Sequence, residues 1–267
     1  MLQRFGQKLR NNSGFAATLL DVYILLNLGF LALDVFIAHS VNAFAHRVEW
    51  IPFYFSLAAP VVLALTIFTE KQNLRKFCRL GIAGCAICLG IAGMLFHLSS
   101  AFFADLTLKS LVYTAPFVAP LAYTGLGMLL VTNQMIPDTD RQWAQWVVFL
   151  SGCGWCGNFL LSALDHAQNG FFDATEWIPV ITSALAVGYF ITLYCQPDQA
   201  GLSKYGIAVF GVNFFVGIAG FFLHLLADLH LPSAEDTEKF LYGAPVFAPL
   251  LFSDLSVLAF LGLSKWR

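Results

Sequence analysis

Three residues with metal-ligating side chains recur in this sequence after 127 positions. The two sets are His39, Glu49 and His97, and His166, Glu176 and His224. Imidazole nitrogen and carboxylate oxygen together suit Zn²⁺, Fe²⁺ or Cu²⁺. The sequence therefore predicts a redox or hydrolytic metal centre, either as one site in each set or as a single dinuclear site where the two sets converge.

A fourth candidate ligand lies close to the glutamate in each set. These two residues are His46 and Asp173, again 127 positions apart. His46 follows His39 by seven residues, so the two side chains share a helix face if the first helix extends that far. Glu49 then lies about one turn further on. A purely structural interpretation remains open, because a glutamate ahead of Trp-Ile-Pro also favours a helix N-terminus.

Two further roles are open to the residues of these sets and their neighbours. His97 and His224 lie inside apolar stretches, where ionisable groups are functional candidates. As axial ligands at equal depth they would hold one haem between the two halves of the chain. Tyr113 and Tyr242 also match each other. We expect them to hydrogen-bond a ligating side chain from behind, or to belong to an interfacial belt of aromatic residues.

The recurrence extends well beyond the candidate ligands. Glu-Trp-Ile-Pro at 49–52 and Gly-Ile-Ala-Gly at 90–93 both return 127 positions later. Residues 113–121 match 242–250 after a two-residue insertion. This pattern predicts a tandem duplication of a four-helix unit, with parallel copies related by a pseudo-two-fold axis along the membrane normal. The predicted repeats are residues 1–135 and 136–267, which together form one membrane domain.

Composition identifies the surroundings that must hold these residues. The 267 residues are 58% hydrophobic and 11% charged, with a mean hydropathy of +0.73, which excludes an ordinary soluble domain. A net charge of −2 gives no electrostatic basis for binding nucleic acid. Spanning a bilayer takes roughly 20 apolar residues in a helix. Eight continuous stretches are long enough, so we expect an all-α membrane protein with spans at about 15–38, 51–69, 80–103, 110–132, 143–164, 177–195, 205–228 and 241–264.

The basic residues predict the orientation of these spans. With the N-terminus in the cytoplasm, eleven Lys and Arg residues fall in inner segments and three in outer segments. The inner set includes Arg4, Lys8, Arg10 and Arg267. Because positive charge accumulates on the cytoplasmic side, we expect both termini inside. The protein would then lie in the cell (inner) membrane with its polar site facing the periplasm.

Other residues keep alternative functions open. Asp254 lies near the centre of the last span, where an uncompensated charge is costly, and it suggests an ion path. Kinks are expected at Pro116, Pro120, Pro245 and Pro249, as in many transport proteins. An ion or solute transporter or channel is therefore the alternative, and a non-catalytic structural subunit is the second. The sequence leaves open whether the protein is an enzyme, a homo-oligomer or part of a membrane complex.

Overall fold

The computed structural model describes residues 14–233 and 235–266, and these residues form helices and no strand. The first half contains α2 (Phe15–Ser40), η1 (Arg47–Glu49), α3 (Trp50–Ile67), α4 (Gln72–Ser99), α5 (Leu108–Tyr113) and α6 (Leu121–Met135). The second half contains α7 (Arg141–Gln168), η2 (Ala174–Glu176), α8 (Trp177–Cys195), α9 (Leu202–Leu229), α10 (Asp236–Tyr242) and α11 (Leu250–Lys265). The basic residues Arg4, Lys8, Arg10 and Arg267 lie outside the described residues.

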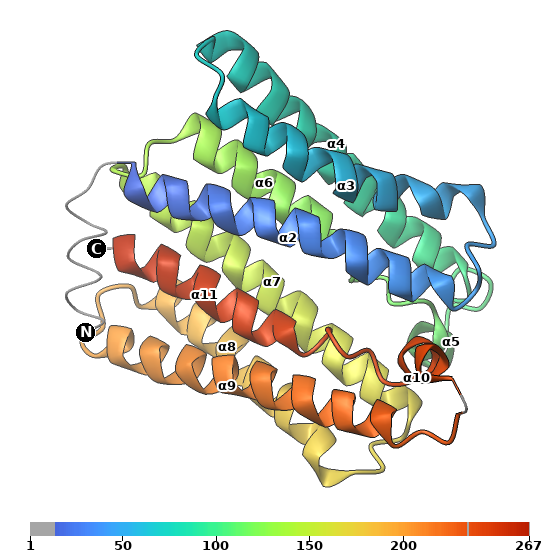
Figure 1. The fold of residues 1–267 in the computed structure, drawn as a ribbon. Coiled ribbons are helices and arrows are strands. Elements are labelled where there is room, and N and C mark those ends of the chain that lie inside the picture. The colour runs from blue at the N-terminus through green and yellow to red at the C-terminus, as the bar shows by residue number, and fades with distance from the viewer. Residues whose placement is uncertain (1–13, 234, 267) are drawn as a thin grey trace.

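Six helices of the described chain are long and apolar enough to cross a membrane. They run side by side in Figure 1, with the start of α2 and the end of α11 at one end of the bundle. Large apolar side chains on their outer faces are exposed, including Tyr54, Leu65, Phe96 and Phe215. Because so much exposed apolar surface is unfavourable in water, the six-helix arrangement is that of a helical multi-pass protein in a lipid bilayer.

The expectation of eight continuous spans is wrong at 110–132 and 241–264. In the first case α5 ends at Tyr113, the chain continues without helix, and α6 begins only at Leu121. The second case is the same, with α10 ending at Tyr242 and α11 beginning at Leu250. Each predicted kink is a complete break, because two prolines four positions apart remove backbone donors in the same turn. The second proline of each pair, Pro120 or Pro249, directly precedes the first residue of the next helix, α6 or α11.

Glycines let α4 pack tightly against the start of α6, and α9 against the start of α11. A Cβ on Gly90 would meet Pro120 O at 2.7 Å, and one on Gly93 would meet Pro120 Cβ at 2.7 Å. In the second half, Gly217 and Gly220 stand against Pro249 in the same way, at 2.8 and 2.7 Å. The helices therefore approach closely at these glycines, and this contact fixes the ends of α4 and α9 beside the breaks.

Helix α2 forms the main polar connection between the two halves. Tyr23 Oη donates to Asp254 Oδ2 over 2.5 Å, and Asn27 Nδ2 donates to Asp254 Oδ1 over 2.9 Å. The aspartate that suggested an ion path thus has two hydrogen-bond donors on α2. Nearby, Asp21 pairs with Arg79 of α4, so this second intramembrane acid is also compensated.

Candidate functional site

The first set of predicted ligands converges from three helices at the bundle end opposite the start of α2. We call His39, Glu49 and His97 cluster 1. His39 lies in the last turn of α2, Glu49 directly precedes α3, and His97 lies in the last turn of α4. His39 Nδ1 is 3.6 Å from Glu49 Oε2, and the ring centroids of His39 and His97 are 6.1 Å apart.

The second set converges in the same manner, and we call His166, Glu176 and His224 cluster 2. His166 Nδ1 lies 3.5 Å from Glu176 Oε2, and His224 is close enough to His166 to interact with it electrostatically. The helices that carry this cluster, α7, α8 and α9, end or begin at the same end of the bundle as those of cluster 1 (Figure 1). The structure therefore brings the six candidate ligands that are identical in the two halves together as two clusters of three.

A sharp turn between α2 and α3 places Glu49 next to His39, and the equivalent turn between α7 and α8 places Glu176 next to His166. Phe44 and Phe171 adopt φ angles of 52°, in the left-handed region that bulky residues rarely enter. Their rings stack at 4.0 Å on Trp50 and Trp177, respectively. The backbone N–H of Phe44 also donates to His39 O over 3.0 Å. Sequence reasoning missed these phenylalanines, although they too are 127 positions apart.

The helix breaks orient the third candidate ligand of each cluster, His97 and His224. His97 Nδ1 lies 2.9 Å from Pro116 O, and His224 Nδ1 lies 3.0 Å from Pro245 O. Because a carbonyl oxygen only accepts, Nδ1 must carry the proton in both rings. The lone pair of Nε2 is then free. A backbone carbonyl that fixes the tautomer in this way is the usual support for a metal-ligating histidine.

The glutamates present unpaired oxygens inside the clusters. Glu49 Oε2 and Glu176 Oε2 are buried and make no hydrogen bond to any described residue. The other oxygen of Glu49 accepts a 3.3 Å hydrogen bond from Asn42. A buried carboxylate oxygen without a donor is costly, so each cluster has an unmet requirement for a proton or a cation.

The His–Glu distances within the clusters are longer than those of hydrogen bonds and slightly longer than those of a closed metal site. The 3.5 and 3.6 Å separations of His and Glu are too long for hydrogen bonds. They are close to the roughly 3.3 Å between two ligands of a tetrahedral ion with bonds of about 2.0–2.1 Å. His97 stands further out than such an ion requires. Accordingly, no three His, Cys, Asp or Glu side chains of the described chain stand close enough to hold a metal ion as they are arranged.

The remaining two predicted ligands do not join the clusters. Helix α2 ends at Ser40 and the chain then turns back, so the expectation that His46 continues the helix face of His39 is wrong. His46 is exposed. Asp173 is exposed too, and it accepts hydrogen bonds of 2.8 and 2.7 Å from the backbone and hydroxyl of Thr175. These bonds hold the pKa of Asp173 below its usual value and give it a helix-capping role.

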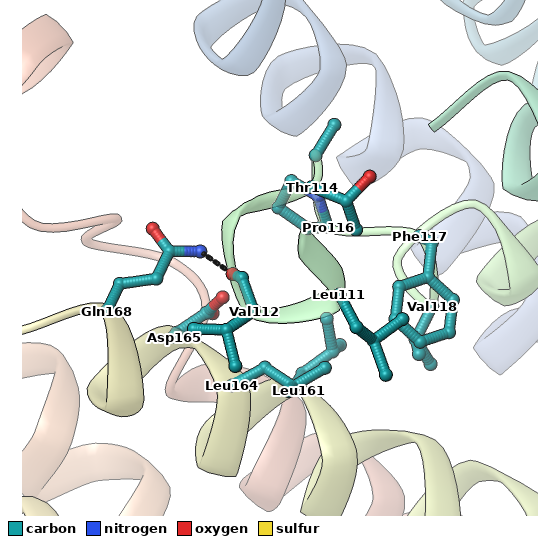
Figure 2. A pocket seen from close by; sticks show the side chains of 11 residues that line it. Leu111, Val112, Thr114, Pro116, Phe117, Val118, Leu161, Leu164, Asp165 and Gln168 are labelled. Atoms are coloured by element: carbon teal, nitrogen blue, oxygen red, sulfur yellow. Dashed lines mark hydrogen bonds between the residues drawn. The ribbon is translucent and has the colours of Figure 1, made fainter. Parts of the chain in front are cut away.

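The two predicted supporting tyrosines lie at the surface. Tyr113 and Tyr242 are the last residues of α5 and α10, and their side chains are 59% and 66% exposed. Backbone carbonyls of Pro116 and Pro245 occupy the supporting position instead. Figure 2 shows a pocket beside this region, lined by Thr114 and Pro116 of the first break and by Asp165 and Gln168 of α7.

Comparisons with known proteins identify no relative. No family model, curated protein or solved structure matches this chain.

Proposed function

We propose that the protein is a membrane metalloprotein that binds one transition-metal ion, Zn, Fe or Cu, in each cluster. The observation that carries this proposal is the repeated arrangement of an unpaired buried Glu oxygen, a histidine 3.5–3.6 Å from it, and a second histidine whose Nε2 is free. Binding would draw His97 and His224 inward by a small side-chain movement. Three protein ligands leave a fourth position for water or a substrate, as in redox and hydrolytic centres.

Two separate sites are favoured over one shared centre. Every contact of cluster 1 that we describe joins residues of the first half, and every one of cluster 2 joins residues of the second. The haem alternative requires His97 and His224 to face each other across the halves, whereas each is bonded to the break of its own half. A tandem duplication of a four-helix unit, with each broken pair counted as one pass, would produce two such sites at equal depth.

The bias of Lys and Arg residues supports an orientation with the clusters toward the periplasm. Arg75, Lys76 and Arg79 are in the first turns of α4, at the end of that helix remote from His97. In a cell membrane this end would face the cytoplasm. Both clusters would then meet ions and substrates outside the cell.

Metal content of the purified full-length protein tests the proposal. After loading with Zn²⁺, Fe²⁺ or Cu²⁺ and removal of free ion, elemental analysis should find two ions per chain for one of these metals. His97→Ala and His224→Ala should each remove one ion. His46→Ala is the matched control and should keep both, because His46 lies outside cluster 1.

Two results would contradict the proposal. One is the absence of stoichiometric metal under all three loading conditions. The other is a haem absorption band that disappears in both His97→Ala and His224→Ala, which would establish the single haem instead.

A further inference from the structure

The second half carries a line of buried polar side chains that the first half lacks. On one face of α7, at successive spacings of four, three and four, lie Ser151, Trp155, Asn158 and Ser162, which are 0–9% exposed. We call these four residues the α7 polar line. The residues 127 positions earlier on α2 are apolar throughout, namely Ile24, Leu28, Leu31 and Val35. The line is thus a property of one half and has no role in a packing scheme common to both.

Several polar atoms of this line have no hydrogen-bond partner among the described residues. Ser151 Oγ, Trp155 Nε1 and Asn158 Nδ2 are buried and make no hydrogen bond to any described residue. Asn213 Oδ1 on α9 is likewise buried without a hydrogen bond to any described residue. It lies one turn after Phe210, and the ring centroids of Phe210 and Trp155 are 5.9 Å apart. Trp143 shows the usual arrangement, since its Nε1 donates to Asn133 Oδ1 over 2.9 Å. Several unpaired groups together in a bilayer interior indicate a missing polar ligand.

The line leads toward the surface at one end. Asp165, one turn after Ser162, lines the pocket in Figure 2 between α7 and the segment that includes α5. Gln168, at the edge of the same pocket, donates to Val112 O over 2.8 Å and holds α5 against α7. The residue that corresponds to Asp165 in the first half is Ala38. The polar character therefore continues from Ser151 to an opening near cluster 2, over about 21 Å of helix.

We propose that the α7 polar line binds a file of internal water molecules that enters at the Asp165 pocket and reaches Trp155 and Ser151. Water is the ligand that satisfies hydroxyl, amide N–H, amide oxygen and indole N–H groups together, and buried water with two to four partners is an ordinary structural element. The proposal does not depend on metal binding. With this water file the two halves differ in hydration. The second half is hydrated to the middle of α7, whereas the first half is dry at the corresponding positions of α2.

Hydrogen–deuterium exchange of two tryptophans tests the proposal in the full-length protein in lipid nanodiscs. Trp143 and Trp155 are both 0% exposed and lie on the same helix, but only Trp143 has a protein acceptor. Ultraviolet resonance Raman spectra follow indole N–H exchange, and Trp143→Phe and Trp155→Phe assign the two signals. We expect Trp155 to exchange well ahead of Trp143. Equal, slow exchange of both would overturn the proposal.

A second test of the water file uses variants of the α7 polar line that carry the apolar residues of the corresponding positions on α2. Asn158→Leu and Ser151→Ile install the residues found at Leu31 and Ile24. Each should slow exchange of Trp155 by about two- to tenfold, the effect of one hydrogen bond, and leave Trp143 unchanged. Ser256→Ala is the control, since that buried hydroxyl donates to Phe252 O and lies outside the line.

Unchanged exchange of Trp155 in both variants would contradict the proposal, as would a more heat-stable Asn158→Leu protein, which indicates a dry, unpaired amide. Metal content of Asn158→Leu should equal that of the wild type. Failure of the metal proposal is therefore distinguishable from failure of this one.

Discussion

Tyr23 on α2 donates a 2.5 Å hydrogen bond to Asp254 on α11, and this bond joins residues 231 positions apart. Asn27 donates to the other oxygen of the same carboxylate. Asp254 thus accepts from two side chains of the other half of the protein. This arrangement gives Asp254 a structural role at the junction of the halves, where the sequence suggested an ion path.

Removal of the Tyr23 hydroxyl should loosen this junction. We expect Tyr23→Phe to lower stability by about 0.6–1.7 kcal/mol, the range measured for hydrogen bonds between membrane helices. Thermal unfolding in detergent is the measurement. Tyr205→Phe is the control, because Tyr205 is 65% exposed near the start of α9. Equal stability of Tyr23→Phe and Tyr205→Phe would show that the junction does not depend on this bond.

The glycine contacts predict opposite effects for two substitutions on α4. Gly93→Ala should destabilise the protein by about 1–3 kcal/mol, because the new Cβ would stand 2.7 Å from Pro120 Cβ and α6 must move. Gly84→Ala should be neutral or stabilise the protein by up to about 1 kcal/mol, since nothing lies within 4 Å of its Cβ. Thermal unfolding of both variants tests this difference, and a stable Gly93→Ala protein would be inconsistent with the packing described.

The unpaired glutamate oxygens predict a selective loss of metal. Glu49→Gln should remove the ion from cluster 1 and Glu176→Gln the ion from cluster 2, because a neutral amide is a much weaker ligand than a carboxylate. Asp173→Asn should retain both ions, since Asp173 caps η2 outside the cluster. Elemental analysis of the three variants separates six-ligand from eight-ligand arrangements. Metal loss in Asp173→Asn would show that Asp173 is a ligand and would support the set of eight ligands that includes His46 and Asp173.

Acid should release the metal. Histidine binds a metal ion only when neutral, and its ordinary pKa is about 6.5. Retention should therefore fall as the pH is lowered, because protons then compete with the metal for the imidazole nitrogens. Dialysis at graded pH followed by elemental analysis measures this. Retention that is independent of pH between about 5 and 8 would argue against histidine ligands.

The sequence was sufficient to predict much of the fold and the convergence of the ligands. Six of the eight predicted spans correspond to long apolar helices, and the 127-residue recurrence singled out His39, Glu49 and His97 with their counterparts. The predicted span 15–38 matches α2 closely, but the sequence did not reveal that the chain turns back before His46, because that turn depends on the Phe44 ring stacking on Trp50. Continuous hydropathy likewise concealed the breaks before α6 and α11, since apolar residues occupy both helix and linker.

The start of α2 has a consequence for how the protein is made. The carboxylate of Asp138 accepts hydrogen bonds from the backbone N–H groups of Gly14, Ala16 and Ala17, at 2.9–3.2 Å. Asp138 is synthesised more than a hundred residues after these groups. During translation these N–H groups therefore cannot bond to Asp138 until the residues of α2 to α6 have all been synthesised. The start of the first half is thus capped by a residue of the second half, so a first half ending at residue 135 would lack the acceptor for these N–H groups.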